Sequence, residues 1–256
     1  MAKEKSAIER FAESKFMRKL QEGSQKLASN EIFSTISGGM GATMGLIMVG
    51  AVIQIVCAVG AMFGWDTSSA SYQAFYMPYK LTMGLMGFFM CFSMAYNYAK
   101  RKKMNQMQSV VTALVCYILV VSPPVSASVV AADGTIGRAF DALNLSSLGT
   151  GGMFVAIIVG LCSVAISKFV IDHNWTIKLP DVVPEGIAHS FNAIIPMSVN
   201  IIVWYGISLI ISAVSGGALT LSSLITLILS VPVNFLTSTP GMFVVIALAQ
   251  LCWFFG

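Results

Sequence analysis

The amino-acid sequence predicts an all-α membrane protein with about six transmembrane helices, an N-terminal amphipathic helix and a short interfacial helix near 219–231. Two observations support this fold class. Hydrophobic residues make up 56% of the 256 residues and charged residues only 10%, whereas a soluble domain carries about 25% charged residues. The charges also lie in short stretches between uncharged segments, several of which are long enough to cross about 30 Å of hydrocarbon.

Residues 1–30 are expected to form an amphipathic helix on the cytoplasmic surface of the membrane. Ser6 and Glu9 fit a capping box, and apolar residues recur at helical spacing from Ile8 to Leu20. Charged residues occupy the other faces, which is typical of a helix lying in the membrane interface. A plain solvated helix is the alternative.

Apolar, uncharged segments follow, and we expect five of them to be spans. Their ranges are 36–63, 81–98, 109–130, 151–167 and 191–215. The third contains Pro123 and Pro124, which either lie within a buried membrane helix or mark its end. Residues 131–150 are expected to form a polar loop.

The last part of the chain departs from this pattern. Leu219–Val231 has 13 apolar residues before Pro232, which is too short for a span and favours a re-entrant or interfacial helix. The run from Gly241 to Gly256 is 16 residues long, and a span needs roughly 20. The sixth span is therefore expected to be interrupted.

The basic residues predict the orientation. If the N-terminus is cytoplasmic and the spans alternate, 13 of the 15 Lys and Arg residues lie inside. Seven of these precede residue 30, four form Lys100–Lys103, and the others are Lys168 and Lys178. Such a bias follows the positive-inside rule. It explains the net charge of +4 by membrane topology, so no nucleic-acid partner is expected.

No catalytic constellation is apparent. The expected spans contain no Asp, Glu, Lys, Arg or His, and intramembrane ionisable groups are the usual mark of proton or ion pathways. The five cysteines all fall in apolar stretches and form no CxxC pair, so neither a cofactor nor a metal site is expected. Asn192, Asn200, Gln54 and Gln250 are expected to hold helices together, with hydrogen bonding to a polar solute as the alternative.

The loop between the fourth and fifth spans is the strongest candidate for a functional element. Pro180 and Pro184 bracket a turn that Asp181 could cap, and Glu185 favours a helix N-terminus that continues into the fifth span. A shaped cytoplasmic loop suggests docking or gating, with Asp181, Pro184, Glu185 and His189 as its candidate residues.

Two histidines, His173 and His189, lie in this fourth-to-fifth loop. Each could serve as a ligand or general base. A solvated or interfacial histidine is the interpretation we favour for both.

Two motifs carry a resemblance to a known family. Residues 179–196, LPDVVPEGIAHSFNAIIP, resemble a segment of the membrane-embedded IIC components of the bacterial sugar phosphotransferase system, lactose/cellobiose family. Residues 238–256, STPGMFVVIALAQLCWFFG, are similar to the Pro-Gly-led span of that family. The chain departs from the family's pattern at His189, where Arg is frequent, and at Glu185, where a second Pro is usual.

The resemblance implies a homodimer in the bacterial plasma membrane. It would bind an extracellular, cellobiose- or lactose-like disaccharide and move it inward for phosphorylation by a separate IIB protein. Residues 31–215 would form a five-helix scaffold and dimerisation part, and residues 216–256 the interfacial helix and the start of the transport part.

The resemblance also places the family's sugar-contacting histidine and glutamate beyond Gly256. We therefore expect a truncated or split permease, whose substrate-binding residues are unknown and which has no catalytic residue in this chain. One alternative is a non-transporting membrane scaffold or regulatory protein derived from the same half. Another is an unrelated solute transporter or channel with a coincidental motif.

Overall fold

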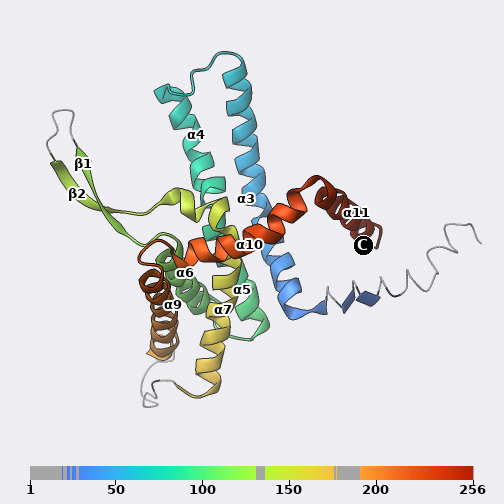
Figure 1. The fold of residues 1–256 in the computed structure, drawn as a ribbon, viewed down its shortest axis with the longest axis vertical. Helices are drawn as coiled ribbons and strands as arrows, with labels where there is room; N and C mark the ends of the chain where they lie inside the picture. Colours follow the sequence, from blue (N-terminus) through green and yellow to red (C-terminus); the bar gives the residue numbers. More distant parts are fainter. Residues whose placement is uncertain are drawn as a thin grey trace, which may run out of the picture. The chain divides into compact units, whose positions relative to one another are not determined.

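The computed structural model of the protein describes residues 29–130, 136–175, 177 and 191–255, together with residues 19, 22, 23, 25 and 26. These residues are mainly helical (Figure 1). They group into two compact units, one of residues 38–227 and one of residues 1–37 with 228–256. The two units are described separately below.

The larger unit contains most of the secondary structure. Its elements are α3 (Glu31–Met62, from residue 38 on), α4 (Ala70–Thr82), η1 (Met83–Leu85), α5 (Met86–Arg101), α6 (Gln106–Val121), β1 (Val125–Val130), β2 (Ile136–Ala142), η2 (Leu145–Leu148), η3 (Thr150–Gly152), α7 (Met153–Asp172), α9 (Ile194–Val214) and the first half of α10 (Leu221–Thr237).

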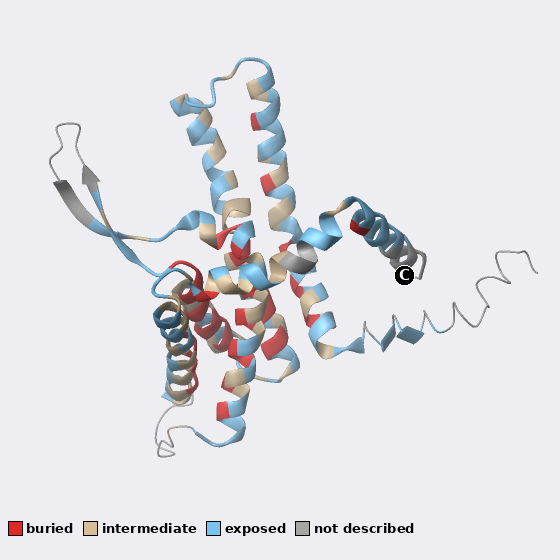
Figure 2. Ribbon diagram, in the orientation of Figure 1, coloured by how far each residue is buried: buried red, intermediate tan, exposed pale blue. Residues whose placement is uncertain are grey.

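The core of this unit is a helical bundle. α5 packs on α6 and α7, and α9 packs on α6 and α7. Figure 2 shows that the buried residues gather on α5, α6 and α7, while most of α3 and α4 is exposed or only partly covered. The helices therefore differ sharply in how much of their apolar surface lies inside the protein.

Small residues allow α5 and α7 to approach closely. The buried residues of α7 are all Val, Ala, Gly or Ser. A Cβ atom added at Gly160 of α7 would lie only 3.1 Å from Cβ of Met94 and 3.3 Å from the carbonyl oxygen of Cys91 on α5. Lipid tails are as apolar as these side chains, so the hydrophobic effect does not drive helices together inside a bilayer. Close backbone packing of this kind is therefore a main source of helix association.

α3 and α4 contact the rest of this unit much less than the bundle helices contact one another. The hydroxyl of Ser93 on α5 donates a 2.9 Å hydrogen bond to the carbonyl of Gly39 on α3. The chain turns at Trp65, whose indole N–H donates to Ser71 at 3.1 Å. Ser69 then caps α4 by accepting from the backbone N–H of Tyr72. N-cap serines of this kind stabilise a helix start by about 1 kcal/mol.

The expected third span and the polar loop after it need correction. α6 ends at Val121, and residues 125–130 pair as an antiparallel strand with residues 136–142 (Figure 1). The reason is local: the two prolines after Ser122 lack backbone donors and end the helix, and the β-branched residues that follow favour a strand. The all-α expectation is therefore wrong at this hairpin.

Other boundaries also shift. The expected span 81–98 is divided, because α5 covers 86–101 while residues 81–85 belong to the end of α4 and to η1. The short helix expected at 219–231 is observed as α10, which continues through residue 232 to Thr237. Helix α4 was not expected.

Three described helical segments are long and apolar enough to cross a membrane. They are Glu31–Met62, Thr150–Asp172 and Ile194–Val214, which correspond to the first, fourth and fifth expected spans. Gln106–Val121 and Leu221–Ser230 are shorter apolar helices. A total of about six spans stays a prediction.

The smaller unit contains the start of α3, the second half of α10, and α11 (Thr239–Phe255). Asn30 caps α3, since its side-chain oxygen accepts from the backbone N–H of Ile32 at 3.0 Å. Ser238 begins α11, and its hydroxyl accepts from the N–H of Gly241 at 3.4 Å. The amphipathic helix expected for residues 1–30 falls almost entirely outside the described residues.

The packing of α5 on the turn before α7 yields a stability prediction. A Cβ atom at Gly87 would lie 2.7 Å from the carbonyl oxygen of Gly149 and 2.8 Å from that of Leu148. Gly87→Ala should therefore lower the free energy of unfolding by about 1–3 kcal/mol, measured by denaturant titration in mixed micelles. Gly206→Ala on α9 is the matched control, because its added Cβ meets nothing within 4 Å. Equal stability of the two variants would contradict the close packing.

Candidate functional site

The four residues predicted to dock or gate lie outside the described residues. These are Asp181, Pro184, Glu185 and His189, so their role stays a prediction. The end of the same motif is described at 191–196, where the chain enters α9. That end lines a cavity, which is the candidate functional site.

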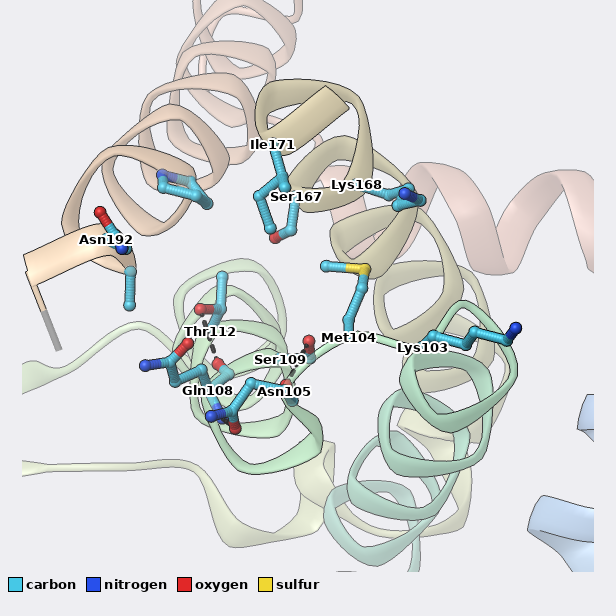
Figure 3. Close-up of a pocket in the computed structure, with 12 residues that line it drawn as sticks. Lys103, Met104, Asn105, Gln108, Ser109, Thr112, Ser167, Lys168, Ile171 and Asn192 are labelled. Carbon is cyan, nitrogen blue, oxygen red and sulfur yellow. Dashed lines mark hydrogen bonds between the residues drawn. The ribbon is translucent and has the colours of Figure 1, made fainter. Parts of the chain in front are cut away.

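The cavity has a volume of about 310 Å³ and lies where four helix ends meet (Figure 3). It is bounded by the α5–α6 turn, the start of α6, the end of α7 and the entry into α9. The lining residues are Lys103, Met104, Asn105, Gln108, Ser109, Thr112, Ser167, Lys168, Ile171, Asn192, Ala193 and Pro196.

The α5–α6 turn is built by the sequence around Lys103. The backbone N–H of Met104 donates to the carbonyl of Ala99 at 2.9 Å, and Lys103 adopts a left-handed φ of 55°, as in a Schellman helix end. Asn105 then caps α6, because its side-chain oxygen accepts from the N–H of Gln108 at 3.2 Å. Only four residues, Lys102–Asn105, therefore connect α5 to α6.

The wall formed by α6 is polar but neutral. Ser109 donates its hydroxyl proton to the carbonyl of Asn105, and Thr112 donates to that of Gln108, both at 2.9 Å. Each hydroxyl oxygen then keeps its acceptor lone pairs. Facing them, Ser167 of α7 accepts a 2.9 Å hydrogen bond from Asn200 and keeps its own proton to donate. The cavity can therefore hydrogen-bond an uncharged polar group from two sides.

The charged residues sit at the edge of the cavity. Lys168 pairs with Asp172 one turn along α7, and Figure 3 shows the side chain of Lys103 extending away from the other lining residues. No group of three or more His, Cys, Asp or Glu that could hold a metal ion occurs in the part of the chain that the structure describes. The neutral polar side chains that line the cavity suit the binding of an uncharged polar group.

His173 caps the end of α7 outside this cavity. It is exposed, and its Nδ1 lies 2.8 Å from the carbonyl oxygen of Phe169. Its ring centroid lies 4.1 Å from that of Phe169. These two contacts with Phe169 hold the His173 side chain at the end of α7.

Buried hydrogen bonds fix α9 on α7 and so place Asn192–Pro196 at the cavity. Asn200 donates to Ser167 at 2.9 Å, and the indole N–H of Trp204 donates to Ser163 at 2.9 Å, one helical turn away. This confirms the expectation that Asn200 joins helices. Its amide oxygen is buried and has no hydrogen-bond partner among the described residues, so the amide group is held only through its nitrogen.

The cavity residues of α6 and α7 were not predicted as a site. A signal was present: Asn105, Gln108, Ser109 and Thr112 recur at helical spacing at the start of an otherwise apolar helix. Such a polar stripe on a membrane helix indicates an interior or water-facing surface.

Apolar helices around an uncharged interior, with basic residues at one end, define a polytopic α-helical membrane protein. Comparison with known proteins identifies the family. The family model described as "Phosphotransferase system, EIIC" matches residues 32–256, so the chain belongs to this family of bacterial membrane sugar transporters.

Curated relatives agree with this assignment. The chain is 25% identical over 242 residues to the "PTS system lactose-specific EIICB component" of Streptococcus mutans serotype c, an alignment that covers 91% of this chain and 40% of that protein. It is 28% identical over 199 residues to the protein of the same name from Staphylococcus epidermidis, covering 74% of this chain and 32% of that one. The chain thus spans less than half the length of these relatives.

A solved structure has the same fold. The crystal structure of the transporter ChbC, the IIC component from the N,N'-diacetylchitobiose-specific phosphotransferase system, superposes with a TM-score of 0.71 at 22% identity. The match covers 87% of this chain and 52% of that chain. It supports the helical architecture described above.

The hydrogen bond between Trp204 and Ser163 yields a prediction by double-mutant cycle. Trp204→Phe and Ser163→Ala should each destabilise the protein, and their coupling energy should be about 0.5–1.5 kcal/mol, the range of hydrogen bonds between membrane helices. Unfolding in mixed micelles measures both. Trp175→Phe is the control, because Trp175 is exposed. Additive effects of the two core substitutions would refute the contact.

Proposed function

We propose that this chain forms the front part of an EIIC sugar permease, which moves a disaccharide across the plasma membrane for phosphorylation by an EIIB protein. The observation that carries this proposal is the family match, which runs from residue 32 to the end of the sequence. It favours a transport component over a non-transporting scaffold. Residues 31–215 would serve as scaffold and dimerisation part, and residues 216–256 as the start of the transport part.

The substrate class follows from the relatives. The curated relatives are lactose-specific, and the structural neighbour belongs to an N,N'-diacetylchitobiose-specific system. Both sugars are disaccharides, which supports a disaccharide here. A cellobiose- or lactose-like sugar is the proposed substrate, bound with the help of the part of the permease that makes the relatives longer.

The proposed partner site is the end of the bundle that carries the cavity. Lys100–Lys103 and Lys168 lie at this end, so by the positive-inside rule we propose that it faces the cytoplasm, with the N-terminus on the same side. Asp181, Pro184, Glu185 and His189 lie between α7 and α9 in the sequence, and we propose that they belong to this partner site. EIIB would dock on this face, and two copies of the chain would form a homodimer.

Sugar accumulation tests the function. Cells that contain the soluble phosphocarriers but lack a lactose-type permease would express this chain, the remaining part of such a permease, or both. We expect radiolabelled, phosphorylated disaccharide to accumulate when both parts are present and not with either alone. If the pair is inactive although both parts reach the membrane, the scaffold alternative is favoured.

Topology gives a second prediction. Ser190→Cys in the α7–α9 loop should react with a membrane-impermeant maleimide only in inverted vesicles, and Ser68→Cys in the α3–α4 turn only in intact cells. The parent chain is the control, because its cysteines lie in apolar segments and should stay unlabelled. The reverse pattern would overturn the proposed orientation.

A further inference from the structure

A second hollow in the larger unit lies between α3 and α5. It is an open groove of about 410 Å³. Ala42, Thr43 and Leu46 of α3 form one wall, and Phe89, Phe92 and Tyr96 of α5 form the other. Ala42, the smallest of the lining residues on α3, is exposed.

The α5 wall of the groove is mainly aromatic. The rings of Phe92 and Tyr96 stack one helical turn apart, with centroids 6.5 Å apart and planes inclined by only 2°. These side chains remain 41% and 43% exposed. Two parallel aromatic rings at the edge of a groove offer an elongated hydrocarbon chain a continuous contact surface.

The hydroxyls of Thr43 and Ser93 and the side-chain amide of Asn97 already donate hydrogen bonds to backbone carbonyls. Ser93 donates to the carbonyl of Gly39, and the side-chain amide of Asn97 donates to the carbonyl of Ser93, both at 2.9 Å. With these donors used, the groove does not require a polar occupant. It therefore suits an apolar chain better than a sugar.

The same face of α5 ends in two basic residues. Residues four apart lie above one another on a helix, so Tyr96 is followed by Lys100 and Asn97 by Arg101. Both are in the last turn of α5 and are exposed. An apolar groove that leads along one helix face to two positive charges is complementary to a molecule with a hydrocarbon chain and an anionic head.

We propose that this surface binds an anionic phospholipid, with one acyl chain in the α3–α5 groove and the phosphate beside Lys100 and Arg101. The bilayer supplies the ligand, and basic residues next to a membrane helix attract anionic headgroups. A free phosphate would leave the groove empty. This lipid site goes beyond sugar transport and does not depend on its direction or substrate.

Native mass spectrometry of the full chain in detergent tests the proposal. Phosphatidylglycerol and phosphatidylcholine with identical acyl chains would be titrated separately, and the dissociation constant of the first bound lipid measured. Because each basic residue contributes to headgroup attraction, we expect phosphatidylglycerol to bind about tenfold tighter or more. Equal affinity for the two lipids would overturn the proposal, as would displacement of the lipid by inorganic phosphate.

Charge variants locate the headgroup. Lys100→Gln with Arg101→Gln should remove the preference for phosphatidylglycerol. Lys103→Gln with Lys168→Gln is the matched control, because it removes the same charge at the edge of the other cavity and should keep the preference. An equal loss in both double variants would mean that only the overall charge attracts lipid.

A groove-filling variant tests the acyl chain without changing charge. Ala42→Phe should weaken phosphatidylglycerol binding several-fold. Ala58→Phe, also at an exposed position of α3, should not. The same spectra report oligomeric state. A shift from dimer to monomer in Ala42→Phe, with lipid binding unchanged, would assign the groove to a second copy and refute the lipid site.

Discussion

The close approach of α5 and α7 is the constraint on which the rest of the larger unit depends. Inside a bilayer, apolar helices gain nothing by hiding apolar side chains from lipid, so packing and hydrogen bonds must hold them together. Gly160 brings the α7 backbone against Cys91 and Met94 of α5, and Gly87 near the start of α5 lies against the carbonyl oxygens of Leu148 and Gly149, which precede α7. The bundle is thus held by surface complementarity between small residues.

The hydrogen bonds between α7 and α9 depend on this packing of α5 against α7. Ser163 and Ser167 are buried on α7 and bind Trp204 and Asn200 of α9, so two hydroxyls set the rotation and height of α9. The start of α9 then closes the cavity against the start of α6. Loss of the hydrogen bond between Asn200 and Ser167 would therefore change the cavity directly, because Ser167 lines it.

Much of the fold follows from the sequence, because long uncharged runs have few alternatives to a membrane helix. These runs predicted α3, α7 and α9 nearly in full. The failures have local causes. α4 contains Lys80, Pro78 and several polar residues, so composition did not predict a helix there, although Ser69 caps it.

The candidate site was only partly predictable. The motif ending at Pro196 pointed to the entry of α9, and Pro196 does line the cavity. The wall formed by α6 could not be predicted as part of the same site. That prediction would need the knowledge that α6 lies next to α7, and residue spacing within one helix does not reveal its neighbours. Residues 125–130 show the same limit, since a short apolar run after two prolines fits a span and a strand equally well by composition.

The β1–β2 hairpin has a consequence for how this protein can vary. Cα partners Val125 and Ala142 close its base, and the N–H of Asn144 donates to the Ser122 hydroxyl at 2.7 Å. The chain therefore leaves and re-enters the bundle at one fixed point. We therefore expect that residues can be added or lost between Val125 and Ala142 without displacing α6 or α7.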